Sequence, residues 1–232
     1  MLGWLRRRDA AVSYAVVVLV LAVAIGLLPG RLAQRFVINS STNLANLRSH
    51  PPYVLLVSAF VISPLWQVWI LAPAVWVYGE IQRWLGRGSV LVVAVLGHVG
   101  ATLFVATMIS AGIAHGQVSL AEARGADVGV SYGLVTAMGL LAARLPVHRR
   151  AGGLGWVTRD VYVGLVSAAL VLLLVLDRSF TDLGHLSAWG IGLSLAWLLV
   201  QASRHPSVVT SEVESGLDDG SPPLPERRRP IG

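Results

Sequence analysis

The sequence predicts an all-α membrane protein: a bundle of six transmembrane helices with both termini in the cytoplasm. Composition, six long uncharged runs and the distribution of arginine lead to this fold class. Of the 232 residues, 55% are hydrophobic and 13% are charged, whereas a soluble domain carries about a quarter charged residues. The mean hydropathy of +0.68 agrees. This composition excludes an ordinary soluble domain.

The uncharged runs divide the chain into three parts. Residues 1–9 are expected to be a cytoplasmic N-terminus, 10–204 a membrane domain, and 205–232 a disordered cytoplasmic tail rich in Pro, Ser, Asp, Glu and Arg. A transmembrane helix needs about 20 mainly apolar residues. The predicted spans are 10–28, 53–79, 89–114, 128–143, 161–176 and 183–201. The long amphipathic segment 30–52 is expected to lie in the membrane interface.

The positions of the arginines predict the orientation. All 18 basic residues are arginine. With the N-terminus inside, 13 arginines fall in inner segments and the other five in outer segments: Arg31, Arg35, Arg48, Arg124 and Arg178. Since cytoplasmic loops of membrane proteins carry the excess of positive charge, both termini are predicted to be cytoplasmic. The Lys-free, Ala-, Val-, Leu- and Gly-rich composition indicates a GC-rich genome, and we expect a bacterial plasma membrane protein in contact with the lipid bilayer.

Several function classes are disfavoured by what the sequence contains. It has no cysteine, which excludes disulfides, thiolate metal sites and a cysteine nucleophile. No metal or cofactor motif is recognisable. The basic balance does not indicate nucleic-acid binding, because the arginines flank apolar runs instead of forming an aromatic-interleaved patch. A small transporter would require intramembrane charges, and the predicted spans are almost free of carboxylates.

Ser131 and His185 are the candidate catalytic residues. Ser131 lies four residues after Asp127, the last charge before the fourth span, and His185 lies three residues after Asp182, the last charge before the sixth. Both spans start at the outer face, so both side chains are expected about 5–6 Å below that boundary. Histidine is the usual base that activates a serine hydroxyl near neutral pH. The sequence therefore predicts a Ser-His dyad.

The motifs around these residues resemble those of the rhomboid family of intramembrane serine proteases. Gly129-Val130-Ser131-Tyr132-Gly133 is similar to the GxSG nucleophile motif that begins the fourth core helix. His185 followed by Ala188 and Gly192 is similar to the HxxGxxxG pattern of the sixth helix, and Gly139 matches a typical glycine eight residues after the serine. These small residues also predict close contact between the fourth and sixth spans. The resemblance covers about 49–201.

This resemblance implies a six-helix rhomboid-like bundle and an intramembrane serine peptidase. Ser131 and His185 would cleave transmembrane protein substrates near the outer membrane boundary, without a cofactor. Two departures favour a catalytically inactive rhomboid-like protein that binds transmembrane clients. Tyr132 stands where the motif has glycine, and the stretch 62–71 lacks the histidine and asparagine oxyanion donors of the family's second helix. Trp66 and Gln67 are the candidate hydrogen-bond donors there.

Two further polar residues are expected to have structural roles. His98, in the middle of the third span, is expected to be a buried, hydrogen-bonded side chain. Glu80 is expected to form a structural ion pair with Arg83 at spacing i, i+3.

Overall fold

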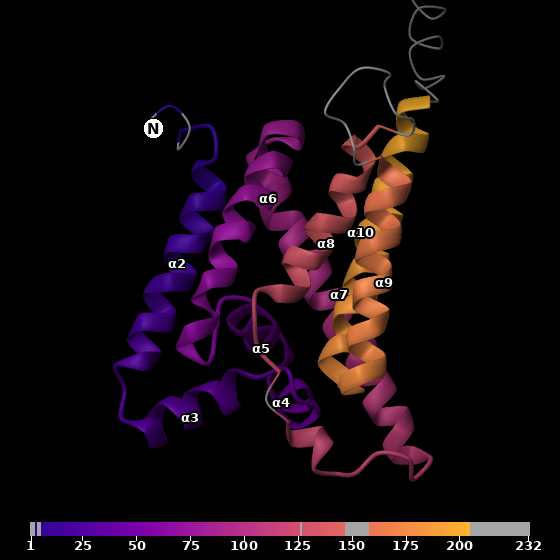
Figure 1. Ribbon diagram of the computed structural model, residues 1–232. Helices are drawn as coiled ribbons and strands as arrows, with labels where there is room; N and C mark the ends of the chain where they lie inside the picture. Colours follow the sequence, from indigo (N-terminus) through magenta and orange to yellow (C-terminus); the bar gives the residue numbers. More distant parts are fainter. Residues whose placement is uncertain (1–2, 4–5, 126, 147–157, 205–232) are drawn as a thin grey trace, which may run out of the picture.

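The described part of the chain is an all-helical bundle. The computed structural model describes residues 3, 6–125, 127–146 and 158–204, and the regular elements in these ranges are helices (Figure 1). The bundle helices are α2 (Asp9–Gly26), α6 (Leu71–Leu85), α7 (Arg87–Ala114), α8 (Ser131–Leu141), α9 (Arg159–Asp177) and α10 (Phe180–Arg204). The predicted tail, 205–232, lies outside the described residues.

The bundle helices alternate in direction, and different elements lie at the two ends of the bundle. The start of α2 and the end of α10 lie at the same end, which we call the terminal end (Figure 1). The opposite loop end carries α3 (Gly30–Ser40), α4 (Leu44–Ser49) and α5 (Pro51–Ser58). There α3 runs across the end of α2 instead of continuing it (Figure 1), which is the arrangement expected of an interfacial helix.

Four helices have the length and composition of membrane spans: α2, α7, α9 and α10. They correspond to four of the predicted spans, with ends that differ by a few residues. The predicted fourth span, 128–143, is represented by α8 and the short 3-10 helix η3 (Ala142–Arg144). Because α8 has 11 residues and α6 has 15, they are only about 16 and 22 Å long.

The prediction that 53–79 forms one continuous helix, the second span, is wrong. Its residues form α5, an irregular stretch at 59–64, the 3-10 helix η1 (Leu65–Ile70) and the first part of α6. Pro64 has extended backbone (ψ 164°), and proline both lacks an N–H and disfavours helix in the residue before it. Pro73 is tolerated because it lies in the first turn of α6, where a backbone N–H has no acceptor within α6 itself.

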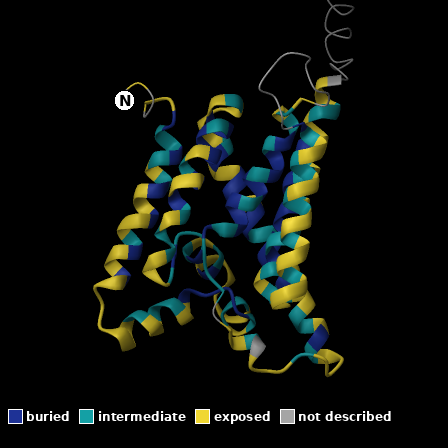
Figure 2. Ribbon diagram, viewed as in Figure 1, coloured by how far each residue is buried: buried dark blue, intermediate teal, exposed yellow. Residues whose placement is uncertain are grey.

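The outward faces of the bundle are apolar. Large hydrophobic side chains are exposed along α2, α7, α9 and α10, and none of the residues of α9 is buried (Figure 2). A soluble protein would not expose apolar surface continuously along several helices. These faces are the surfaces that lipid covers in a multi-pass membrane protein.

The interior of the bundle is centred on α8, which packs against α7, α6 and α10. The hydroxyl of Thr136 on α8 donates a hydrogen bond of 2.9 Å to the carbonyl of Ala188 on α10. A Cβ on Gly192 would lie 2.2 Å from the Thr136 carbonyl oxygen and 2.9 Å from the Cα of Gly139. The two helices therefore touch backbone to backbone, as the small residues predicted.

An ion cluster holds the terminal end together. Glu80 on α6 forms the expected pair with Arg83, at 3.2 Å, and lies 3.8 Å from Arg144 of η3. It also accepts a hydrogen bond from Arg8, a buried side chain just before α2. The Glu80–Arg83 prediction is confirmed. The long-range partners were missed because sequence spacing indicates only neighbours on the same helix.

Candidate functional site

Ser131 is the first residue of α8 and lies where a loop meets the core. The preceding Gly129 has φ +142°, a conformation that side-chain-bearing residues rarely adopt. Its N–H donates a hydrogen bond of 3.1 Å to the carbonyl of Ser58, which fixes the turn that leads into α8. The half-buried Ser131 therefore sits in the first helical turn, where backbone N–H groups have no intrahelical acceptor.

His185 lies in the second turn of α10, close to the loop end. Its side chain is half-buried, and its Nδ1 is 3.9 Å from Oδ1 of Asp182, one turn earlier. This distance allows electrostatic attraction but exceeds that of a hydrogen bond. Asp182 in turn accepts a hydrogen bond from Ser179 Oγ, which links it to the turn between α9 and α10.

The packing of α8 on α10 places Ser131 and His185 at similar heights. The two helices run in the same direction (Figure 1) and meet at the Thr136–Ala188 hydrogen bond. Ser131 precedes Thr136 by five residues, about 7.5 Å along the axis, and His185 precedes Ala188 by three, about 4.5 Å. Their heights thus differ by only about 3 Å. Within the described residues, no hydrogen bond joins the two side chains.

The aromatic ring of Tyr132, the residue after the candidate nucleophile, packs on His185. The rings of Tyr132 and His185 pack edge to face with centroids 5.3 Å apart. Tyr132 also lies 6.2 Å from the His98 ring, and its hydroxyl donates to the Asp127 carboxylate at 3.1 and 3.2 Å. In the sequence, this contact was indicated only by the tyrosine that stands where the motif has glycine. The direction of the Tyr132 side chain could not be predicted from the sequence.

Asp127 belongs to the loop before α8 and connects this site to the first loop of the chain. Its carboxylate also accepts a hydrogen bond of 3.4 Å from Thr42, whose hydroxyl lies 2.9 Å from the Asp127 carbonyl oxygen. Burial raises the pKa of Asp127, although the hydrogen bonds from Tyr132 and Thr42 oppose this shift. The loop end therefore contains a carboxylate whose charge is poorly solvated.

His98 has the structural environment expected from the sequence. It is 2% exposed, and its Nε2 is 2.7 Å from the Ser58 hydroxyl oxygen. Because that hydroxyl donates to the carbonyl of Val54 at 2.6 Å, the histidine must be the donor in the His98–Ser58 pair. His98 therefore cannot act as a base toward Ser58, and it ties α7 to the end of α5.

The expected position of the second-helix donors needs correction. Trp66 and Gln67 lie in η1, before the helix, and Trp66 is 68% exposed. The helix that packs beside α8 is α6, and its Tyr78 hydroxyl would lie 2.6 Å from a Cβ on Gly133. This hydroxyl is buried without a hydrogen-bond partner among the described residues. A polar side chain of α6 that reaches α8 is thus Tyr78.

Together, the fold and the site define a helical multi-pass membrane protein with a serine and a histidine near one end of its core. A family model described as rhomboid-like protein matches residues 4–205. Since this match covers most of the chain, the protein belongs to the rhomboid-like family. Comparison with curated proteins and with solved structures gave no match.

Proposed function

We propose that this protein is a rhomboid-type intramembrane serine peptidase that cleaves transmembrane proteins near the outer boundary of a bacterial plasma membrane. In this proposal all six bundle helices cross the membrane, both termini are cytoplasmic, and the loop end faces outward. The observation that carries the proposal is the packing of α8 on α10, which puts Ser131 and His185 at nearly the same height. Membership of the rhomboid-like family supports it.

The proposed chemistry uses only side chains and backbone of this chain. The Ser131 hydroxyl attacks the scissile carbonyl while His185 takes its proton, and the imidazolium then protonates the leaving amine. Backbone N–H groups in the first turn of α8 stabilise the oxyanion, helped by the positive end of the helix dipole. Water then hydrolyses the acyl-enzyme by the same proton transfers in reverse. Attack requires Ser131 Oγ to come within about 2.6–3.2 Å of the imidazole.

The second candidate function is an inactive rhomboid-like protein that binds transmembrane clients. Its support is Tyr132, whose ring lies against His185 where the family motif has glycine. In that case the partly buried hydrogen bond from Tyr132 to Asp127 fixes the ring, and Ser131 never gains a base.

Labelling with a fluorophosphonate probe separates the two functions, because the probe requires a hydroxyl activated by a base. We expect covalent labelling of the purified protein that is lost in Ser131→Ala and falls steeply in His185→Ala. Ser187→Ala is the matched control, since Ser187 is two residues from His185 and donates to the carbonyl of Gly184. His98→Ala tests the other buried histidine.

Labelling that persists in Ser131→Ala would refute the peptidase proposal. Absence of labelling in a folded wild-type protein that still binds transmembrane peptides would establish the client-binding function instead.

A further inference from the structure

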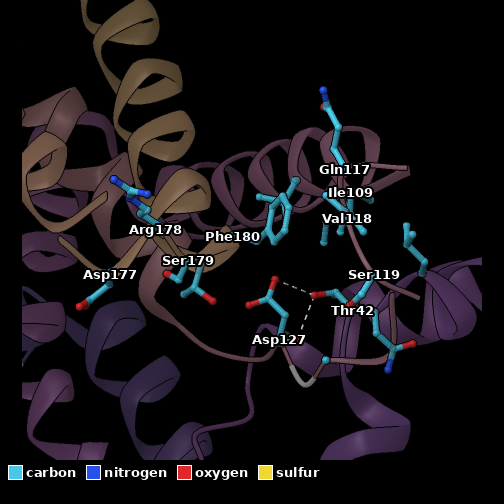
Figure 3. Close-up of a pocket in the computed structure, with 16 residues that line it drawn as sticks. Thr42, Ile109, Gln117, Val118, Ser119, Asp127, Asp177, Arg178, Ser179 and Phe180 are labelled. Atoms are coloured by element: carbon cyan, nitrogen blue, oxygen red, sulfur yellow. Dashed lines mark hydrogen bonds between the residues drawn. The ribbon is translucent and has the colours of Figure 1, made fainter. Parts of the chain in front are cut away.

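A cavity of about 510 Å³ opens at the loop end, beside the candidate site. This volume lies within the range of about 300–1,000 Å³ that is typical of ligand sites. Four parts of the chain surround it: residues 42–44 after α3, the second half of α7 with the loop that follows it, the loop before α8, and the α9–α10 turn with the start of α10. Phe180, Ile109 and Val118 form an apolar wall, and Asp127 lies opposite them (Figure 3).

The carboxylate of Asp127 faces this cavity without a cationic partner in the described ranges. The ion pairs found there join other residues. Arg178 also lines the cavity, but its guanidinium points away from Asp127 (Figure 3). Hydrogen bonds from Tyr132 and Thr42 satisfy part of the carboxylate's acceptor capacity. A partly buried carboxylate with spare lone pairs is an unusual lining for a cavity unless a cation binds there.

We propose that this cavity is a subsite for a lysine or arginine side chain on the outer flank of a transmembrane polypeptide client. The ammonium or guanidinium group binds Asp127, and the aliphatic stem lies along the apolar wall of Phe180, Ile109 and Val118. Long cationic side chains combine these two chemistries, because they bury an apolar stem and present a charged head. A charge-assisted hydrogen bond to a partly buried carboxylate is among the stronger polar contacts in proteins.

Charge complementarity favours a polypeptide side chain over a lipid headgroup. A phosphatidylethanolamine headgroup carries a phosphate next to its ammonium, and this phosphate would require a cation in the cavity wall. Arg178, which lines the cavity, is directed elsewhere (Figure 3), while Asp127 faces inward. An isolated cationic side chain leaves no anion unpaired.

The proposed subsite lies next to the candidate catalytic residues. Asp127 is joined by a hydrogen bond to Tyr132, whose ring packs on His185. The side chains of Asp127 and Tyr132 would therefore connect a bound client residue to the candidate base, His185. The inference rests on the proposed function, since it requires a transmembrane polypeptide client.

Peptide binding in lipid nanodiscs tests the subsite. The probe is a fluorescent single-pass peptide with one Lys in its outer flank, compared with the same peptide carrying Gln, and the protein is the full chain with Ser131→Ala to prevent turnover. We expect the Lys peptide to bind about tenfold more tightly or better. Asp127→Asn should abolish this preference, whereas Asp177→Asn, at the rim of the same cavity, should retain it.

Three results would overturn the subsite: equal affinity for the two peptides, an unchanged preference in Asp127→Asn, or loss of the preference when phosphatidylethanolamine is added to phosphatidylcholine nanodiscs. As a second measurement, a photoreactive lysine analogue in the peptide should cross-link to the cavity wall, and cross-links confined to other surfaces would also refute it. If both peptides bind equally while Ser131 of the wild-type protein is labelled by the fluorophosphonate, the subsite fails and the peptidase proposal stands. If neither binding nor labelling occurs, both fail.

Discussion

Replacement of Gly192 by alanine should destabilise the bundle at the contact that positions the candidate dyad. The new methyl group would lie 2.2 Å from the carbonyl oxygen of Thr136 and 2.9 Å from the Cα of Gly139. Both are backbone atoms, so relief requires α8 and α10 to separate, because no flexible side chain can rotate away. Overpacking of this kind costs about 1–3 kcal/mol, and the absence of an easy adjustment favours the upper part of that range.

Gly190→Ala provides a matched control on the same helix. Gly190 is exposed, and nothing lies within 4 Å of the position that its Cβ would occupy. Alanine there should be neutral or stabilising by up to about 1 kcal/mol, because glycine is the poorer helix former. The two variants make the same chemical change on α10, and only the packing differs.

Thermal unfolding in detergent measures the effect. For a chain of this size, 1 kcal/mol corresponds to about 2–4 °C in Tm, so Gly192→Ala should unfold several degrees below wild type and Gly190→Ala should not. Fluorophosphonate labelling should fall in Gly192→Ala as well, since His185 lies two turns earlier on the displaced helix. Equal midpoints for the two variants would refute the inferred α8–α10 contact.

Three other predictions concern topology, the ion cluster and pH. Ser119→Cys should react with an impermeant thiol reagent on whole cells and Gly88→Cys only after lysis, and the reverse pattern would invert the orientation. Glu80→Gln should lower the unfolding free energy by about 1–3 kcal/mol because it removes the carboxylate that pairs with the buried Arg8, whereas Arg83→Gln, at a more exposed pair, should cost less than about 1 kcal/mol. Burial raises the pKa of Asp127, so the stability that this group contributes is present below its ordinary pKa near 4 and is lost as pH rises through its native pKa. The Tm of Asp127→Asn minus that of wild type should therefore increase from pH 4 to pH 7. A Tm difference that does not change with pH would refute the raised pKa.

The long helices were predictable because the bilayer imposes a length and a polarity that a sequence displays directly. The runs 89–114 and 161–176 lie within α7 and α9, since nothing in them interrupts the hydrophobic pattern. The run 53–79 is equally apolar but is divided into separate elements, and hydropathy alone does not distinguish a span from an apolar loop. Pro64 was the available signal, because proline lacks an N–H and disfavours helix at the residue before it, and its backbone is indeed extended in the folded chain.

For the candidate site, the sequence predicted which residues approach one another better than how they meet. Helix rise and the glycine and alanine positions were sufficient to bring α8 against α10, since both follow from backbone geometry. Which side chain of α8 reaches His185 depends on the turn at Gly129, where a φ of +142° sets the direction of the residues that follow. Sequence periodicity assumes a regular helix and cannot supply that angle. As a result Tyr132, and through it Asp127, became visible as neighbours of His185 only in the folded chain.

Tyr132 and Asp127 also distinguish the two proposed functions. If the Tyr132 ring moves aside when a client enters, Ser131 would gain His185 as its base. If the hydrogen bond to Asp127 holds the ring in place, the protein would bind clients without cleaving them. Tyr132→Phe tests this directly, because it keeps the ring and removes the hydroxyl. Fluorophosphonate labelling that rises in this variant would show that the hydrogen bond restrains the dyad, whereas unchanged labelling would show that it does not.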